Sequence, residues 1–151
     1  MFHVALWEPE IAANTGNIGR LCLGAGATLH LVGALGFRLD DRVVRRAGVD
    51  HWDEVHPVRH VTLAEFEASR DLARTFCFSA RATVPYTKTR FQAGDAFLFG
   101  GESNGLPPEV VERYGNRALR IPIPTGKVRS LNLANAVAVA LYEALRQVEG
   151  W

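Results

Sequence analysis

Three segments rich in glycine and amide side chains contain the residue types that best suit close contact with a ligand. The first spans residues 14–20 (NTGNIGR), where two amides and two glycines precede a single charged residue, Arg20. The second spans residues 99–107 (FGGESNGLP), and the third spans residues 121–135 (IPIPTGKVRSLNLAN). Adjacent glycines at the end of a strand let a ligand or another loop approach bare backbone. We therefore expect one binding site built from these three segments.

Several common catalytic signatures are absent from the sequence. The Gly126-Lys127 pair resembles the end of a phosphate-binding P-loop, but Val128 replaces the Ser or Thr that follows in that motif. There is no GxSxG or HExxH, and the five histidines follow no ligand spacing, so we expect no bound metal. Cys22 and Cys77 form no CxxC, which favours two reduced, packed thiols in a cytoplasmic protein.

Positive charge is concentrated although the net charge is only +1, with 17 basic and 16 acidic residues. Arg42, Arg45 and Arg46 share one face of a predicted helix, and residues 113–142 carry five bases and no acid. Fifteen of the bases are arginine, which pairs bidentately with phosphate. The net charge alone neither favours nor excludes binding of a nucleic acid, but the clustering of arginines would suit such a partner.

The elements that must position these segments alternate between strands and helices. Apolar and β-branched runs predict strands at residues 2–7, 28–32, 55–61, 75–79, 96–99 and 119–123. Helices are predicted after an Asn14 or Thr15 cap, within residues 40–47, 63–72 and 133–148, and from the two prolines at 107–108. This alternation indicates an α/β fold with a mostly parallel sheet flanked by helices. Ligands of such sheets bind beyond the carboxyl ends of the strands, where the three segments lie.

At 151 residues the chain has the length of a single domain, and it contains no stretch of 18 apolar residues that would span a membrane. Its strongest periodicity lies in residues 133–148, for which Ser130 is the predicted helix cap. The apolar stripe of this helix alternates with alanines that include Ala140, and one domain needs only one of its faces. We therefore expect the alanine-bearing face to form a homodimer interface with the helix that follows residue 14.

The ordered set of motifs resembles the SPOUT methyltransferase superfamily over nearly the whole chain. The matching stretches are EPEIAANTGNIGRLC (8–22), LGFRLDDRVVRRAGVD (35–50), FLFGGESNGLP (97–107) and IPIPTGKVRSLNLANAVAVALYEALRQ (121–147). They look specifically like the small tRNA wobble-nucleotide (cytidine/uridine-34) 2'-O-methyltransferases. This resemblance implies a C-terminal trefoil knot, a homodimer, a tRNA substrate, and S-adenosylmethionine bound in the knot.

Carried over position by position, the resemblance also implies the residues of the site. Arg20, with Asn17, would be catalytic and would act beside the cofactor of the other subunit. Family accounts often make this arginine the base, but a guanidinium with a pKa above about 12 is better suited to holding a phosphate or a developing oxyanion. Arg42, Arg45, Arg46 and Arg129 would contact RNA. The implied cofactor contacts are Phe78, where a smaller aliphatic residue is expected, and Gly100, Gly101, Glu102, Gly105, Ile121, Ile123, Ser130, Leu131 and Asn135.

Other functions remain compatible with the same motifs. A base N-methyltransferase, or a methyltransferase for rRNA or another RNA, could use this scaffold. A non-enzymatic RNA-binding module could also have kept the fold, although the presence of Arg20, Gly100 and Ser130 argues against it.

Overall fold

The computed structural model describes residues 1–151, and for Asp50 it describes only the backbone. Its strands form one seven-stranded sheet in the order β3-β2-β1-β6-β4-β7-β5, in which every neighbouring pair is parallel. The predicted parallel α/β architecture is therefore confirmed. The strands are β1 (His3–Trp7), β2 (Thr28–Val32), β3 (Val58–His60), β4 (Thr75–Phe78), β5 (Val84–Pro85), β6 (Ala96–Phe99) and β7 (Ala118–Arg120).

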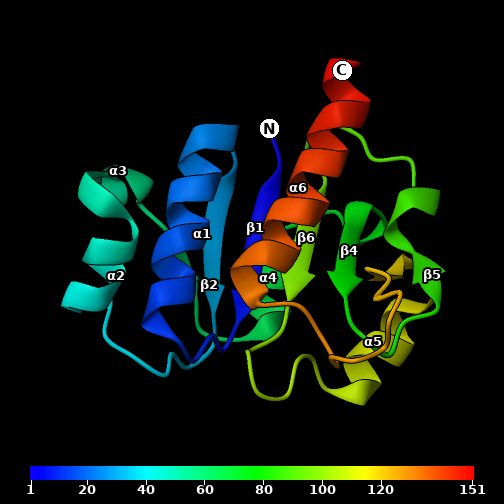
Figure 1. The fold of residues 1–151 in the computed structure, drawn as a ribbon, viewed down its shortest axis with the longest axis horizontal. Coiled ribbons are helices and arrows are strands. Elements are labelled where there is room, and N and C mark those ends of the chain that lie inside the picture. Colours follow the sequence, from blue (N-terminus) through cyan, green and yellow to red (C-terminus); the bar gives the residue numbers. More distant parts are fainter.

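Helices cover both faces of this sheet. In Figure 1, α1 and α6 lie side by side across one face, α4 and α5 lie behind the other, and α2 and α3 pack beside α1. The helices are α1 (Ala12–Ala25), α2 (Arg42–Ala47), α3 (Trp52–Val55), α4 (Leu63–Ala68), α5 (Pro108–Tyr114) and α6 (Leu133–Glu149). Single 3-10 turns occur at η1 (Val49–His51), η2 (Leu72–Arg74), η3 (Tyr86–Lys88) and η4 (Gly115–Arg117).

The alternation of side chains along the strands produces two separate apolar layers. On β1, Val4 and Leu6 point into the cluster that α1 and α6 cover, whereas Ala5 points into the cluster that α4 and α5 cover. Both faces of each central strand are thus buried, as parallel strands require. The two layers hold the strands rigidly, so the loops at their carboxyl ends start from fixed positions.

Several predicted boundaries were wrong for local reasons. Val55, predicted to begin a strand, is the last residue of α3, and the chain turns at His56, whose φ is 47°. The helix predicted to reach residue 72 ends at Ala68, and β7 ends at Arg120, before the prolines at 122 and 124. The short strand β5 was not predicted, since two residues carry no periodic signal.

Two glycines of α1 serve helix packing and not ligand binding. A Cβ on Gly16 would lie 2.4 Å from the Val44 carbonyl oxygen, and one on Gly19 would lie 2.6 Å from the Trp52 ring. The glycines thus let α2 and α3 approach α1 closely. The interpretation of this segment as bare backbone is correct, but the neighbour that approaches it is the chain itself.

The inner face of α6 contains residues that were expected at a dimer interface. Val137, Ala140, Leu141 and Ala144 are completely buried against the sheet. The assignment of Ala140 to an exposed, alanine-bearing face is therefore wrong, because a charge at that position would enter the core. The outward side of the helix instead exposes Val139 by 37% and Tyr142 by 44%.

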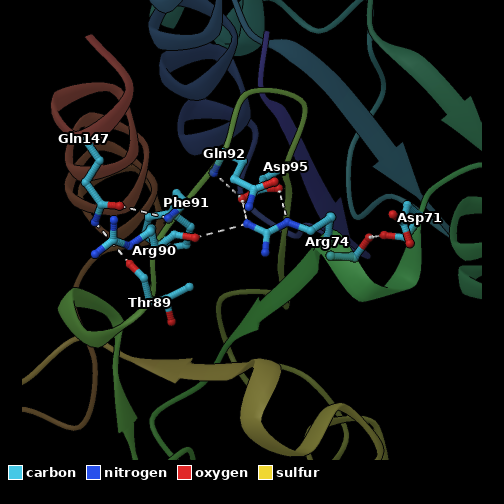
Figure 2. Close-up of polar contacts among 9 residues, drawn as sticks. Asp71, Arg74, Thr89, Arg90, Phe91, Gln92, Asp95 and Gln147 are labelled. Atoms are coloured by element: carbon cyan, nitrogen blue, oxygen red, sulfur yellow. Dashed lines mark hydrogen bonds and ion pairs between the residues drawn. The ribbon is translucent and has the colours of Figure 1, made fainter. Parts of the chain in front are cut away.

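An ion pair with a buried carboxylate anchors the segment before β6. The Asp95 side chain, 1% exposed, accepts hydrogen bonds from Arg74 Nε at 2.7 Å, from Arg74 Nη2, and from the Gln92 amide at 2.8 Å. Figure 2 shows how Gln147 of α6 holds the residues that precede Gln92. Its side chain accepts from the Phe91 amide and donates to the Thr89 carbonyl. The loop before β6 is thereby tied to both η2 and α6.

We predict that Asp95→Asn lowers the free energy of unfolding by about 2 kcal/mol, because the amide cannot accept all three bonds that the carboxylate accepts. Chemical denaturation measures this difference. Asp53→Asn is the matched control: Asp53 pairs with Arg45 at 2.8 Å but is 76% exposed. The control should change stability by less than about 0.5 kcal/mol, as exposed ion pairs contribute little. Equal losses in the two variants would contradict the anchoring role.

Candidate functional site

The carboxyl ends of four neighbouring strands, β1, β6, β4 and β7, meet at one edge of the sheet. The chain runs outward from β1 to β2 and β3 and later returns to place β6 on the other side of β1. Such a reversal of strand order opens a crevice for ligands in α/β sheets. Here the crevice holds a pocket of about 610 Å³, bounded by the loops that follow β1, β4, β6 and β7.

All of the predicted cofactor residues except Asn135 line this pocket. Phe78 is one of these lining residues, and its ring is stacked on that of Phe99, at a centroid distance of 4.8 Å and an interplanar angle of 9°. Asn14 and Asn132 also line the pocket; they lie in the first and third predicted segments but were not among the predicted cofactor contacts. The sequence reasoning missed the segment 79–81, which directly follows β4. These three residues could have been predicted as part of the site, because they directly follow a buried strand. The remaining wall residues are Ile11, Phe99, Ser103, Asn104, Leu106, Arg129, Leu133 and Ala136.

The glycines of the second loop play different parts. A Cβ on Gly100 would lie 2.1 Å from the Gly105 carbonyl carbon, and one on Gly101 would lie 2.6 Å from the Glu8 carbonyl oxygen. Both residues are therefore glycine because the chain packs against itself, which corrects the idea that Gly100 leaves space for a ligand. Gly105 differs, since its φ is 65° and no atom lies within 4 Å of its missing Cβ.

Glu102 binds the amino-terminal end of α1 across the crevice. Its carboxylate accepts from the Glu10 amide at 2.7 Å, the Ile11 amide at 2.9 Å and the Asn14 side chain at 3.1 Å. α1 begins at Ala12, and its N-cap residue, Ile11, makes no side-chain capping bond. The predicted Asn14 or Thr15 cap was therefore wrong, because a carboxylate from a distant loop satisfies these amides and complements the helix dipole.

The third loop joins the same network. Asn132, and not the predicted Ser130, caps α6, with its Oδ1 accepting from the Asn135 amide at 3.2 Å. The Nδ2 group of Asn132 donates to Asn14 Oδ1 at 3.0 Å. Asn14 thus connects Glu102 of the second loop to the start of α6. The three predicted segments do meet, and amide and carboxylate side chains join them.

The two predicted catalytic residues lie beside the pocket and not in its wall. Asn17 lines a separate groove of about 470 Å³ between α1 and α6, together with Asn14, Leu21, Asn132, Ala134, Asn135 and Ala138. Arg20 is exposed one turn further along α1 and lines neither cavity. Within one chain, Arg20 is therefore separated from the residues predicted to hold the cofactor.

The predicted RNA-binding arginines occupy two surfaces. Arg42, Arg45 and Arg46 are exposed on α2, which packs against α1. Arg45 donates to Asp53 at 2.8 Å, so part of its charge is compensated. Arg129 lies at the pocket, where its Nη2 group donates to the Ser103 carbonyl at 3.0 Å.

Acid–base chemistry at the pocket is limited. The Ser103 hydroxyl and amide both donate to Glu10, which holds the pKa of that carboxyl below its usual value. Burial raises the pKa of the Cys22 and Cys77 thiols to about 12, so neither is a ready nucleophile.

No cluster of three metal-ligating side chains occurs among the described residues, and no helix in the described part of the chain could cross a membrane.

Comparison with known proteins identifies relatives over the full length of the chain. One solved structure, which concerns the 2-OH methylation of C/U34 on tRNA, is 46% identical with a TM-score of 0.94, covering 100% of this chain and 98% of that one. The tRNA (cytidine(34)-2'-O)-methyltransferase of Burkholderia pseudomallei (strain 1106a) is 45% identical over 150 residues, covering 97% of this chain and 96% of the relative.

A more distant structure is an AdoMet-bound rRNA methyltransferase from Sinorhizobium meliloti. It is 28% identical with a TM-score of 0.84, and the match covers 96% of this chain and 56% of that one. A family model, that of the SpoU rRNA Methylase family, matches residues 1–142. These matches confirm the resemblance that the motifs indicated. The parallel sheet, the crevice at its carboxyl edge and the similarity over nearly the whole sequence agree, and the chain belongs to the SpoU rRNA Methylase family.

Proposed function

We propose that the chain transfers a methyl group from S-adenosylmethionine to the 2'-hydroxyl of nucleotide 34, cytidine or uridine, of tRNA. The observation that carries this proposal is the agreement over the whole chain, at 46% identity and a TM-score of 0.94, with a structure concerned with that modification. Such a substrate would place the activity in the cytoplasm. One domain, residues 1–151, would carry both cofactor and RNA binding.

The pocket fits the proposed cofactor by its size and by the chemistry of its walls. Apolar side chains such as Ile121, Ile123 and Leu131 offer a surface for a flat base, and backbone groups of the second loop offer hydrogen bonds. The open space at Gly105 leaves room at this wall for a ligand. S-adenosylmethionine would supply a methyl group that its sulfonium already activates.

The protein must then orient the ribose and stabilise its oxygen as the hydroxyl proton leaves. We assign this task to Arg20, as a fixed donor to a phosphate or to the developing oxyanion. Asn17, one turn earlier on α1, would assist it from the α1–α6 groove. A guanidinium stays protonated at neutral pH, so the proton would pass to a phosphate oxygen or to water. The exposed arginines of α2 and Arg129 would contact RNA phosphates.

The same proposal includes a homodimer and a knotted chain. The lining of the groove between α1 and α6 includes the small side chains of Ala134 and Ala138, which would let a second copy approach, and α6 also exposes Val139 and Tyr142. Pairing there would bring Arg20 of one subunit to the pocket of the other, which would resolve its separation from the pocket within one chain. The knot would form where the segment that follows β7 passes the second loop on its way to α6.

We predict that Ala138→Glu separates the subunits and abolishes tRNA methylation while leaving each chain folded. Ala138 lines the groove and is only partly buried, so the charge would disturb a partner more than the core. Sedimentation and thermal melting measure the two effects. Ala64→Glu, at an exposed position of α4, is the matched control and should remain dimeric and active. A fully active monomer would contradict the shared site.

The activity itself is tested by incubating the protein with S-adenosylmethionine and unmodified total tRNA, followed by nuclease digestion and mass spectrometry. The expected product carries a 2'-O-methyl group on nucleotide 34 of a subset of tRNAs. A methylated base, or methylation of ribosomal RNA in its place, would support an alternative enzyme. Absence of cofactor binding would favour a non-enzymatic RNA-binding protein.

A further inference from the structure

We propose that Glu10 is a positioning residue for the cofactor pocket: it holds the tip of the second loop in place through Ser103. This inference rests on the proposed function, because it assumes that S-adenosylmethionine occupies the pocket. Glu10 itself is absent from the pocket wall, so its effect would be transmitted through the residues it binds.

The contact between the two residues uses both oxygens of the carboxylate. Oε1 of Glu10 accepts from the Ser103 amide at 3.0 Å, and Oε2 accepts from the Ser103 hydroxyl at 2.6 Å. The remaining polar group of Ser103, its carbonyl, accepts from Arg129 Nη2 at 3.0 Å. All three polar groups of Ser103 are therefore used, two by the loop after β1 and one by the loop after β7.

The tip of the second loop depends on such bonds because it has little apolar packing. Ser103, Asn104 and Gly105 are all exposed, and the Gly105 amide donates back to the Gly101 carbonyl at 2.9 Å to close the turn. The residues from Gly101 to Gly105 form part of the pocket wall. When the carboxylate of Glu10 is removed, this wall should sample more conformations and bind the cofactor less tightly.

Two glutamates thus link the same pair of loops in opposite directions. Glu102 reaches from the second loop to the amides that precede α1, and Glu10 reaches back from that segment to Ser103. Gly101 lies against Glu10, since a Cβ there would come within 2.9 Å of Glu10 Oε1. Glu102 also lines the pocket, so its replacement would disturb both the pocket and the helix that carries Arg20, whereas Glu10 lies outside the wall and tests the position of the loop alone.

The experiment measures S-adenosylmethionine affinity by calorimetry together with steady-state kinetics. We expect Glu10→Ala to weaken binding and raise the KM for the cofactor about fivefold, with kcat at saturation within about twofold of the original protein. Glu10→Gln can still accept from the Ser103 amide and should restore most of the affinity. Glu8→Gln is the matched control, since it removes the same charge from the same loop without touching Ser103.

A double-mutant cycle with Ser103→Ala separates this contact from a general change in charge. The double variant should bind no more weakly than Glu10→Ala alone, because the hydroxyl has lost its partner already. Additive losses, or unchanged affinity in a folded Glu10→Ala variant, would overturn the positioning role while leaving the proposed function intact. Failure of the unmodified protein to bind S-adenosylmethionine would overturn both.

Discussion

Replacing Arg20 with alanine should lower the rate of methyl transfer about 10²–10³-fold, the usual effect of removing a donor to a developing oxyanion. The affinity of this variant for S-adenosylmethionine should stay within about twofold, because we assign Arg20 to the phosphate or the developing oxyanion of the RNA and not to the cofactor. Single-turnover kinetics and calorimetry measure the two quantities separately. Arg59→Ala, at an exposed position of β3, is the control and should leave both unchanged.

Mixed dimers test whether Arg20 acts across the subunit boundary. Gly105→Val places a branched side chain at a backbone with φ of 65° and at the pocket wall, and should block cofactor binding. Each variant alone should be inactive. If the site is shared, mixing Arg20→Ala with Gly105→Val restores activity, because one site then combines an intact Arg20 with an intact pocket. No recovery in verified mixed dimers, or an Arg20→Ala variant nearly as active as the original, would contradict the assignment.

The location of the site could be predicted from the sequence because it depends on local signals. A buried strand such as β6 is a short apolar run, and the polar, glycine-containing segment after it lies at the carboxyl edge of the sheet in any parallel α/β fold. The same reasoning applies to the loops that follow β1 and β7. This is why the three segments meet at one pocket, whereas the individual cofactor residues, and the ligand that they would bind, came from the resemblance.

The details within the site depend on contacts between distant residues, which no local pattern reveals. The side chain of Asn14, near the start of α1, is a plausible helix cap by residue type. The group that accepts from the free backbone N–H groups is instead the carboxylate of Glu102, more than 90 residues away in sequence. Similarly, two adjacent glycines indicate that something packs closely, but not whether a ligand or the chain does so. At Gly100 the neighbour is the backbone of Gly105 and Leu106.

Helix periodicity did identify the side of α6 that faces the sheet, since Val137, Leu141 and Ala144 of the periodic apolar positions are buried there. The error was to assign Ala140 to the opposite face because it is an alanine.

Another feature that the sequence conceals is a row of three histidines on neighbouring strands. His3 Nδ1 lies 2.9 Å from His30 Nε2, His30 Nδ1 lies 2.9 Å from His60 Nε2, and Arg70 Nη1 lies 2.8 Å from His3 Nε2. The arginine can only donate, so the proton of His3 lies on Nδ1, and the same order then continues through His30 to His60. None of the three rings can gain a proton without losing the bond that its acceptor nitrogen makes.

This row predicts that the protein loses stability in mild acid. Burial and the nearby Arg70 lower the pKa of His3 to about 4, and burial with the neighbouring histidines lowers that of His30 to about 3. Burial also lowers the pKa of His60, although Glu65 opposes the shift. In the unfolded chain these groups titrate near 6.5, so the unfolded state alone takes up protons as the pH falls from 6.5 towards 4.

The free energy of unfolding should therefore be highest above pH 6.5 and fall by about 3 kcal/mol by pH 5, allowing for solvent screening at the less buried His3. Urea denaturation at a series of pH values measures this slope. Replacing His60 with Phe should make the slope shallower, because one fewer neutral histidine is held in the fold, whereas His51→Ala, at an exposed ring, should leave it unchanged. A stability profile that stays flat between pH 7 and 5 would mean that the buried rings accept protons without breaking their bonds.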